Sequence, residues 1–522
     1  MAISTFTMNK ENRAVTAAWK IGLIVMLALA LRLVNLNSRP LWYDEAFTLL
    51  HAEQPLARIF YGTVTQSNGA AADVHPLFFY NLLHVWMSGA GQSPFSVRLL
   101  SVVLGTATVI MVYLLARRLF DERSGLIAAV LTAVAPFHVY YSQEIRMYSL
   151  LGLTTISMTY FFVRAWREGD YGNWVAFAVL AALTLYTHNL GAMFLAGLAL
   201  WVLWTWQRGP HWLHWRPLVW SHLLILLLYV PWLTILPGQF NKIQQAFWIT
   251  RPGLVELIQT VLVFHFSADN QALPGWLVPL ALFFGILLPI VLLLEMNRRR
   301  QANLPSSRFP APVSLLLFLT IAPVLLTFLV SQVRPVYVIR ALLPSALSYY
   351  ILVAGVLFAR LTPKPVQWGL MAPAALIVLL SLLNHYTYTG FPRSSFAEVG
   401  RYLHQHVQTP EDVIVHSNKL TFFPTHYYDR VLTQTFIGDE PGSSSDNLAY
   451  ATQESLGLFA QPDLETAVAG HRRVWLVIFD RALEEYEEAG NQHPHLAWLE
   501  QHYELVNTTK FNDLSVYTYA QP

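Results

Sequence analysis

Apolar stretches of about 20 residues recur along most of the chain, and they limit the available folds more than any other feature. A helix needs about 20 apolar residues to cross the hydrocarbon core of a membrane. Eleven stretches of this kind lie near residues 17–36, 97–116, 124–140, 148–165, 172–187, 190–206, 217–236, 273–294, 311–331, 341–359 and 368–386. The sequence therefore predicts a polytopic α-helical membrane protein.

Composition excludes several other kinds of protein. None of the 522 residues is a cysteine, which rules out disulfides, thiolate metal sites and cysteine nucleophiles. The net charge of +2 gives no reason to expect nucleic acid as a partner. The first apolar stretch is too long for a cleaved signal peptide and has no small-residue cleavage site after it, so we expect it to stay as a membrane helix.

Basic residues orient the predicted helices. Cytoplasmic loops of membrane proteins carry an excess of Lys and Arg. Short loops that alternate along this chain hold the following basic residues: Lys10, Arg13, Lys20, Arg117, Arg118, Arg123, Arg164, Arg167, Arg208, Arg216, Arg298, Arg299, Arg300, Arg308, Arg360 and Lys364. We therefore predict a cytoplasmic N-terminus. The opposite loops, among them a long first outer loop at 37–96, are then extracytoplasmic, and eleven helices place the C-terminal part outside as well.

The composition changes after residue 386, where apolar runs shorten and acidic residues appear. Short β-branched runs at 412–417 and 473–480 read as buried strands, and 503–508 and 513–519 as two more, with helical segments between them. Alternating strands and helices indicate a small α/β domain. We predict two domains: a membrane domain over 1–386 and an extracytoplasmic α/β domain over 387–522.

An acidic pair directly follows the first predicted membrane helix. Asp44 and Glu45 lie in SRPLWYDEAFTLLHAEQ, residues 38–54, beside the aromatic Tyr43. A helix cap at a membrane boundary accounts for such a pair without any chemistry. Adjacent residues on a helix point about 100° apart, so the two carboxylates cannot flank one bond as a glycosidase acid–base pair does. One carboxylate is therefore expected to act chemically while the other binds or orients.

Further charged residues are predicted on the same outer side. Charge near lipid is costly, and arginine there runs against the rule that orients the chain. Several such residues on one side favour binding of a lipid-linked anion over unrelated salt bridges. The residues are Asp73 and His75 in DVHPLFFY, Arg98 in PFSVRLLSVVLG, Glu144 and Arg146 in YYSQEIRMYS, and Arg340 in SQVRPVYVIRALLP.

The order of these motifs resembles a known family. An Asp-Glu pair after the first helix, an Asp-x-His-Pro segment and an arginine opening the second helix are similar to the GT-C superfamily of glycosyltransferases. The likeness is to the bacterial branch of glycosyltransferase family 39, which includes protein O-mannosyltransferase-like and aminoarabinose-transferase-like proteins. The segment RSGLIAAVLTAVAPFHVYYSQEIRMYSLL also resembles that branch. The motifs cover roughly residues 20–165; beyond them the likeness is one of architecture.

The resemblance implies an activity and a set of roles. The donor would be a polyprenyl-phosphate-linked sugar, transferred by an inverting single displacement to a lipid, glycan or protein acceptor. Asp44 would be the catalytic base, Glu45 would help to hold the acceptor, and Arg98 would bind the donor phosphate. This chain departs from the protein mannosyltransferases after Pro76, where Leu-Phe-Phe-Tyr replaces a second proline and Gly-Lys. It also lacks an evident β-trefoil signature, so a Ser/Thr protein acceptor is disfavoured.

Two other functions, and a divalent metal site, could use residues of these types. A transporter or flippase for a lipid-linked anion would also gather outer arginines, but such proteins usually have internal repeats and broken helices in paired positions. A non-catalytic receptor or assembly factor would not need an acidic residue beside an anion site. Asp44, Glu45, Asp73 and His75 are of types that bind divalent ions but lack a recognised ligand spacing. We therefore expect no cofactor, with a divalent metal as the less favoured alternative.

Overall fold

The chain forms two compact units in this computed structural model, which describes residues 2–206, 215–245, 249–268, 271–301, 312–358, 362–407, 409 and 411–522. One unit, the helical unit, contains residues 1–34, 98–234 and 249–387. The other, the mixed unit, contains residues 35–97, 235–248 and 388–522. The mixed unit thus draws together the first predicted outer loop and the C-terminal part. The predicted division into domains at residue 387 stays a prediction.

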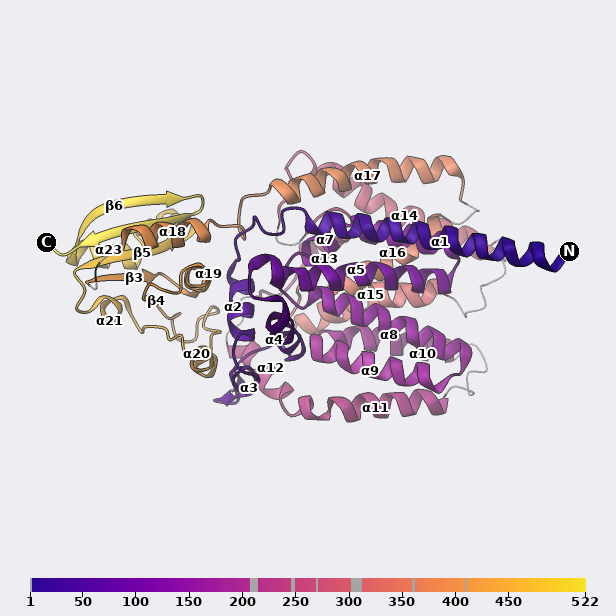
Figure 1. Cartoon of the computed structure of the whole chain (residues 1–522), viewed down its shortest axis with the longest axis horizontal. Coiled ribbons are helices and arrows are strands. Elements are labelled where there is room, and N and C mark those ends of the chain that lie inside the picture. Colours follow the sequence, from indigo (N-terminus) through magenta and orange to yellow (C-terminus); the bar gives the residue numbers. More distant parts are fainter. Residues whose placement is uncertain are drawn as a thin grey trace. The chain divides into compact units, whose positions relative to one another are not determined.

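Helices alone make up the regular structure described in the helical unit (Figure 1). They are α1 (Ala2–Leu33), α5 (Pro94–Leu119, which belongs to this unit from residue 98), α6 (Glu122–Val134), α7 (Pro136–Tyr141), α8 (Tyr148–Glu168), α9 (Tyr171–Thr187), α10 (Gly191–Trp206), α11 (Trp215–Leu233), α13 (Leu254–Phe266), α14 (Val278–Gln301), α15 (Pro312–Ser331), the 3₁₀ helix η2 (Ile339–Leu342), α16 (Leu343–Leu357) and α17 (Lys364–Thr387).

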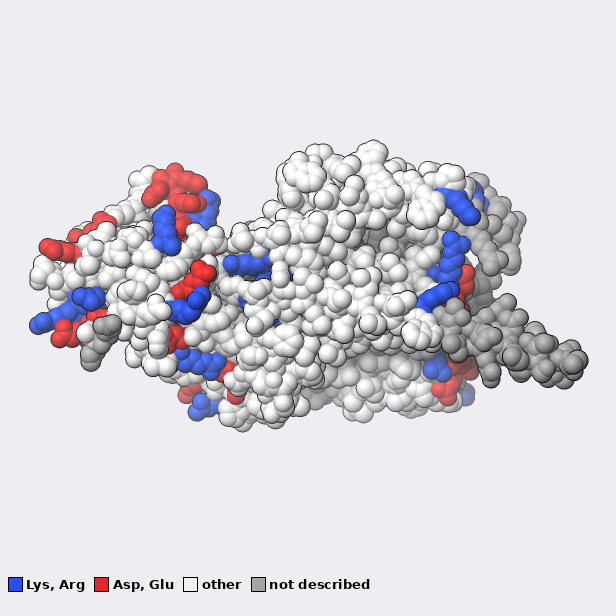
Figure 2. Space-filling view, turned by 45° about the horizontal axis from the view of Figure 1, so that its top comes forward, with Lys and Arg blue, Asp and Glu red and all other residues white. Residues whose placement is uncertain are grey.

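Six spans among the described helices are long and apolar enough to cross a membrane. They are α5, α11, most of α14, α15, η2 with α16, and α17. The apolar helices α9, α10 and α13 are shorter than 18 residues. Figure 2 shows Lys, Arg, Asp and Glu gathered near one end of the helices, beside a broad uncharged side. The polytopic helical class is confirmed, whereas the count of eleven spans and their orientation stay predictions. Of the basic loops, residues 207–214, 302–311 and 359–361 lie outside the described part.

One predicted helix is divided in two. The sequence predicts a single span over 124–140, but α6 ends at Val134 and α7 begins at Pro136. Ala135 between them has extended backbone (φ −60°, ψ 119°). Proline lacks an amide hydrogen and pushes the preceding residue out of the helical region. The prediction of one continuous helix is therefore wrong, because the chain leaves the helical conformation at Ala135 and Pro136 starts a new helix.

A buried arginine satisfies the backbone near this break. Arg32, in the last turn of α1, is fully buried. Its guanidinium donates to the carbonyl oxygens of Ala28 (2.8 Å) and Ala133 (3.1 Å), and it lies 2.7 Å from Nδ1 of His138 in α7. Gln143 donates to the carbonyl of Arg32 at 2.7 Å. Carbonyls at helix ends have no partner within the helix. These side chains therefore hold the ends of α1, α6 and α7 together.

The centre of the helical unit is α16. Every residue of this helix is buried, and it packs against α6, α8, α14 and α15. A helix that is apolar on all sides is stable only when other elements surround it. The apolar stretch at 341–359 is therefore an interior span.

The mixed unit combines short helices with a five-stranded sheet. Its helices are α2 (Tyr43–Ala52), α3 (Leu56–Val64), α4 (Phe78–Ala90), α12 (Leu236–Gln245), α18 (Phe396–His406), α19 (Lys419–Tyr428), α20 (Tyr450–Leu456), α21 (Leu464–Val468), α22 (Asp480–Glu488) and α23 (Pro494–His502). Its strands are the hairpin β1 (Gln66–Ser67) and β2 (Ala70–Ala71), and β3 (Asp412–His416), β4 (Gln434–Phe436), β5 (Arg473–Phe479), β6 (Glu504–Phe511) and β7 (Leu514–Ala520).

The large sheet has the order β4-β3-β5-β7-β6, parallel among β4, β3 and β5 and antiparallel from β5 to β7 and β6. Alternate residues along a strand face opposite sides. In β5, Val474 and Leu476 pack with α21 and α23, whereas Trp475 and Val477 pack with α18. The predicted strands at 412–417, 473–480, 503–508 and 513–519 are confirmed. Strand β4 was missed because its three residues carry no clear apolar pattern.

Close packing in the helical unit gives a first prediction. A Cβ built on Gly105 of α5 would lie 2.6 Å from the Cβ of Ser142, so any larger residue must displace the turn after α7. We expect Gly105→Val to destabilise the protein by about 1–3 kcal/mol, as overpacked interiors usually do. Thermal unfolding in detergent would show a lowered midpoint. Gly22→Ala, at a position with no atom within 4 Å, is the control; equal midpoints for the two variants would contradict the packing.

A buried histidine gives the mixed unit a pH-dependent stability. His416 of β3 is fully buried, its ring donates to Oε1 of Gln434 at 2.9 Å, and burial lowers its pKa to about 3 from 6.5. Below about pH 6.5 the imidazole of His416 is therefore protonated in the unfolded chain but stays neutral in the folded chain. As the pH is lowered from about 6.5 to about 3, the free energy of unfolding should therefore decrease by on the order of 1.4 kcal/mol per pH unit.

Denaturation curves measured from pH 7 to pH 5 test this behaviour. We expect His416→Asn to flatten the pH dependence relative to the wild type, and His406→Gln, on the exposed end of α18, to leave it as it is. The same slope in the wild type and in His416→Asn would show that this ring is not the titrating group.

Candidate active site

The acidic pair lies in the first turn of α2, after the N-cap position. The N-cap residue is Trp42, which has extended backbone and makes no side-chain cap bond. Asp44 is half-buried, whereas only 2% of Glu45 is exposed. Neither carboxylate therefore occupies the N-cap position itself. The helix places Asp44 at its N-terminal end, where the helix dipole favours negative charge.

An aromatic face holds α2 against α19. Tyr43, Phe47 and His51 follow at intervals of four residues and so share one face of the helix. Successive ring centroids are 6.1 Å and 5.7 Å apart, and both Tyr43 and Phe47 meet Phe423 of α19 at 5.7–5.8 Å. The predicted residue Tyr43 thus serves as an anchor for the helix that carries Asp44.

Polar bonds fix the chain on both sides of α2. Before the helix, the amide of Leu41 donates to the hydroxyl of Tyr428 at 2.8 Å. After it, Arg430 forms two hydrogen bonds with the carboxylate of Glu53, at 2.8 and 2.9 Å. A two-pronged pair of this kind fixes orientation as well as distance. The carboxylates of α2 are therefore positioned by residues nearly 400 positions later in the chain.

Asp73 orients His75. One oxygen of Asp73 accepts from Nδ1 of His75 at 3.0 Å and from its amide at 3.1 Å, and the other accepts from the hydroxyl of Tyr80 at 2.8 Å. Burial opposes ionisation, but the charge of His75 and these hydrogen bonds outweigh it and lower the pKa of Asp73. Asp73 therefore stays ionised, and His75 turns its other ring nitrogen away from Asp73. Such a carboxylate is an orienting group rather than a proton acceptor.

The Asp73–His75 pair and α2 belong to one cluster. The ring of His51 meets Tyr80 edge to face at 4.9 Å, and its Nε2 lies 3.0 Å from the hydroxyl of Thr63. Burial lowers the pKa of His51, so this ring is neutral at neutral pH and donates through Nε2. The structure thus brings the two predicted acidic segments of the first outer loop into one connected set of contacts.

In the helical unit the structure brings together the predicted arginines. Arg98 lies in the first turns of α5 and is 2% exposed. One turn later, Ser101 donates to the backbone carbonyl of Glu144 at 2.6 Å. The turn after α7 therefore packs on the start of α5, and it carries both Glu144 and Arg146, which are buried.

Arg340 extends this group of charges. It lies in η2 and is buried, with its guanidinium 5.6 Å from the ring centre of Tyr148 at the start of α8. Tyr148 follows Arg146 by two residues. Arg340 thus lies at the start of α8, and Arg98 lies in the first turns of α5, on which the turn with Glu144 packs. Buried charge in a membrane protein is costly and usually marks a functional site.

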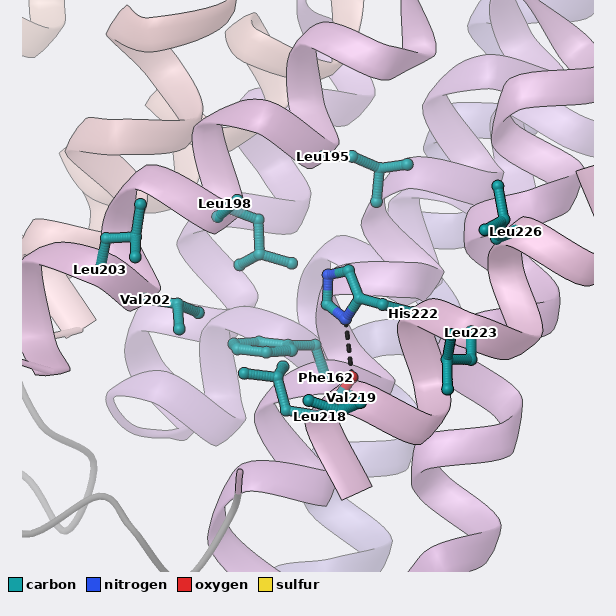
Figure 3. A pocket seen from close by; sticks show the side chains of 11 residues that line it. Phe162, Leu195, Leu198, Val202, Leu203, Leu218, Val219, His222, Leu223 and Leu226 are labelled. Carbon is teal, nitrogen blue, oxygen red and sulfur yellow. Dashed lines mark hydrogen bonds between the residues drawn. The ribbon is translucent and has the colours of Figure 1, made fainter. Parts of the chain in front are cut away.

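An apolar cavity of the helical unit lies elsewhere. It has a volume of about 440 Å³ and is lined by side chains of α8, α10 and α11. Figure 3 shows leucines and valines around it, with His222 hydrogen-bonded to the carbonyl of Leu218 at 2.8 Å. No predicted site residue lines it. We assign no chemistry to it, because its wall is almost wholly apolar.

Both the sequence and the fold of this chain are similar to those of known proteins. Residues 74–235 match the family described as dolichyl-phosphate-mannose-protein mannosyltransferase. The predicted resemblance is confirmed. The chain is 25% identical over 287 residues to the undecaprenyl phosphate-alpha-4-amino-4-deoxy-L-arabinose arabinosyl transferase of Pseudomonas aeruginosa. That alignment spans 52% of this chain and 48% of the relative, about half the length of each.

The fold is shared with solved structures over almost the whole chain. ArnT from Cupriavidus metallidurans bound to undecaprenyl phosphate is similar with a TM-score of 0.60 and 15% identity, covering 96% of this chain and 98% of that one. The Archaeoglobus fulgidus oligosaccharyltransferase, in complex with zinc and sulfate, has a TM-score of 0.54 and 15% identity, covering 96% and 73%. The chain therefore has the ArnT-like fold, which combines membrane helices with a C-terminal mixed sheet.

No group of three or more His, Asp or Glu residues that could hold a metal ion occurs in the described ranges. Nδ1 of His75 and Oδ1 of Asp73 form a hydrogen bond with each other at 3.0 Å. Asp44 and Glu45 are adjacent on α2, so their side chains point in different directions.

Several site residues could not be found from the sequence. His51 and Tyr80 carry no motif signal and matter only because they link α2 to Asp73. Glu53 and Arg430 are 377 residues apart, and each alone reads as a surface charge. Arg32 sits inside an apolar stretch, and that position was the one available signal of a buried role.

The Glu53–Arg430 pair gives a test of how α2 is held. We expect Glu53→Arg and Arg430→Glu each to slow sugar transfer several-fold, because either change lets α2 shift. The double swap, Glu53→Arg with Arg430→Glu, should restore most of the rate, with a coupling on the order of 1 kcal/mol. Initial rates of the four proteins would be compared. Arg481→Ala, which breaks exposed ion pairs on α22, is the control; a double swap no better than the single changes would contradict the role.

Proposed function

We propose that this chain is an inverting glycosyltransferase that moves a sugar from a polyprenyl-phosphate carrier to an acceptor nucleophile. The observation that carries the proposal is Asp44, a half-buried carboxylate on a helix held at both ends and along one face. The family match over residues 74–235 and the ArnT-like fold support it. The donor is proposed by analogy with the ArnT structure, which holds undecaprenyl phosphate.

In the proposed reaction, Asp44 takes the proton of the acceptor hydroxyl as that oxygen attacks the anomeric carbon. A new bond forms between the anomeric carbon and the acceptor oxygen, and the bond from this carbon to the phosphate oxygen breaks. One displacement inverts the configuration. The polyprenyl phosphate leaves with the bonding electron pair, so its growing negative charge needs neutralising more than it needs an acid. Glu45, next to the base, helps to hold the acceptor.

Cationic and hydrogen-bonding groups are proposed to hold the leaving phosphate. Arg98 is the first of them, since guanidinium groups bind phosphate through paired hydrogen bonds. Arg146 and Arg340, which are also buried, are proposed to add positive charge, and Glu144 to limit the excess. His75, oriented by Asp73, is proposed to donate through Nε2 to a substrate oxygen. This set needs no metal ion.

The acceptor is proposed to be a lipid or a glycan. The segment after Pro76 differs from that of the protein mannosyltransferases, and the described C-terminal part forms a mixed α/β sheet rather than a β-trefoil. Both features disfavour a Ser/Thr protein acceptor. We also propose that the N-terminus is cytoplasmic and that the site and the C-terminal part face the extracytoplasmic side, as the basic loops predict.

Replacing the base gives the direct test. Asp44→Asn keeps the size of the side chain but cannot accept the proton, so we expect transfer to fall by about a hundred- to ten-thousand-fold. Binding of undecaprenyl phosphate should stay near the wild-type value. The measurement is transfer of radiolabelled sugar from an undecaprenyl-phosphate donor into membrane acceptors. Glu45→Gln should cost less. Full transfer by Asp44→Asn would overturn the role of Asp44 as base.

A further inference from the structure

Lys242 of α12 is a buried lysine without a direct partner. Only 8% of the residue is exposed. No hydrogen bond or ion pair joins its ammonium to any residue of the described ranges. Lysines that merely cover apolar surface usually keep their ammonium group in bulk water, whereas Lys242 as a whole residue is more than nine-tenths buried.

The helix that carries Lys242 is seated on the candidate site. Gln239, one turn earlier on the same face of α12, donates to the backbone carbonyl of Asp73 at 3.1 Å. Asn241 donates to the carbonyl of Gly69 at 2.9 Å, and Gly238 packs closely against Gln66. Helix α12 thus lies on the hairpin that leads into Asp73 and His75. Lys242 belongs to the same cluster as the orienting pair.

The charges around Lys242 are engaged with other groups. Burial lowers the pKa of Lys242, while Asp446 and Asp73 partly oppose this effect. Asp73 already accepts three hydrogen bonds from His75 and Tyr80. Asp446 accepts from the amide of Gly442 at 3.1 Å.

A second lysine nearby is neutralised where Lys242 is not. Lys419 of α19 is buried, and its ammonium lies 2.5 Å from a carboxylate oxygen of Asp439 and also donates to the carbonyl of Ser445. The two lysines repel each other electrostatically, so they belong to one neighbourhood. Lys419 thus anchors a loop through Asp439 and Ser445, whereas Lys242 has no hydrogen bond or ion pair within the described ranges.

We propose that Lys242 binds a negatively charged phosphate or carboxylate group of a substrate beside the Asp73–His75 pair. This proposal rests on the proposed function, because that function supplies the substrates. The anion has two sources: the phosphate of the polyprenyl donor, or an anionic group on the acceptor. In both cases the bound anion gives the ammonium group the hydrogen bonds that the described protein atoms do not.

Lys242→Met and Lys242→Arg, made in the full chain, test the proposal. Lys510→Met, which removes an exposed lysine of β6, is the matched control. Binding of undecaprenyl phosphate to the purified protein is measured first. Transfer of radiolabelled sugar from saturating donor to membrane acceptors is measured second. A charged hydrogen bond is worth roughly a ten- to hundred-fold change in affinity.

Two results would support the proposal and tell the sources apart. If the anion is the donor phosphate, Lys242→Met should weaken undecaprenyl phosphate binding roughly ten- to hundred-fold, and Lys242→Arg should recover most of it. If the anion belongs to the acceptor, binding should stay at the wild-type value while transfer falls in Lys242→Met and returns in Lys242→Arg. In both cases the unfolding midpoint of the unliganded Lys242→Met protein should match or exceed the wild type, because an unpaired buried charge is lost.

Two results would overturn it. One is wild-type binding and transfer in Lys242→Met. The other is a fall in both together with a lowered unfolding midpoint that Lys242→Arg does not restore, which would mark Lys242 as a structural residue. Failure of the proposed function looks different: the wild type itself would transfer no sugar, and the binding measurement on Lys242→Met would still report whether this lysine holds an anion.

Discussion

The contact between the aromatic face of α2 and Phe423 of α19 sets the position of every residue proposed to act on the acceptor. Tyr43 and Phe47 pack on Phe423, and the two ends of α2 are tied to Tyr428 and Arg430. Buried aromatic pairs are worth more than their area alone, about 0.5–1.5 kcal/mol each. A carboxylate that must lie within hydrogen-bond distance of a hydroxyl needs a backbone held rigidly in place. The C-terminal part of the chain holds the backbone of α2 in this way, through Phe423, Tyr428 and Arg430.

The three carboxylates of the first outer loop, Asp44, Glu45 and Asp73, differ in their surroundings and in their proposed roles. Asp44 is left half-buried at a helix N-terminus, Asp73 is engaged with His75 and Tyr80, and Glu45 is buried. Three carboxylates of one loop thus face three environments. The same logic applies to the lysines, since Lys419 is neutralised by Asp439 and Lys242 is not. Environment rather than residue type decides which group is available for chemistry.

Local patterns in the sequence predicted much of this arrangement, and long-range contacts account for the rest. Apolar length identifies membrane helices, and the short apolar runs of β3 and β5 identify buried strands, because both signals lie within one element. The break at Pro136 was readable from the chain and was missed. The pairing of Glu53 with Arg430 and the seating of α12 on the Asp73 segment were not readable, because each joins segments far apart in the sequence. The acidic pair could be found from its motif, but the contacts of α2 with α19 and Arg430 that hold it could not.

A single-turnover experiment on the wild-type protein tests the central claim most directly. Purified protein in vesicles would be loaded with undecaprenyl phosphate carrying a radiolabelled sugar and supplied with membrane acceptors. The account predicts that free undecaprenyl phosphate appears in equal amount with labelled acceptor, and that the anomeric configuration of the product is inverted. Movement of the intact labelled lipid across the vesicle, without cleavage of the bond between sugar and phosphate, would contradict it and indicate a carrier instead.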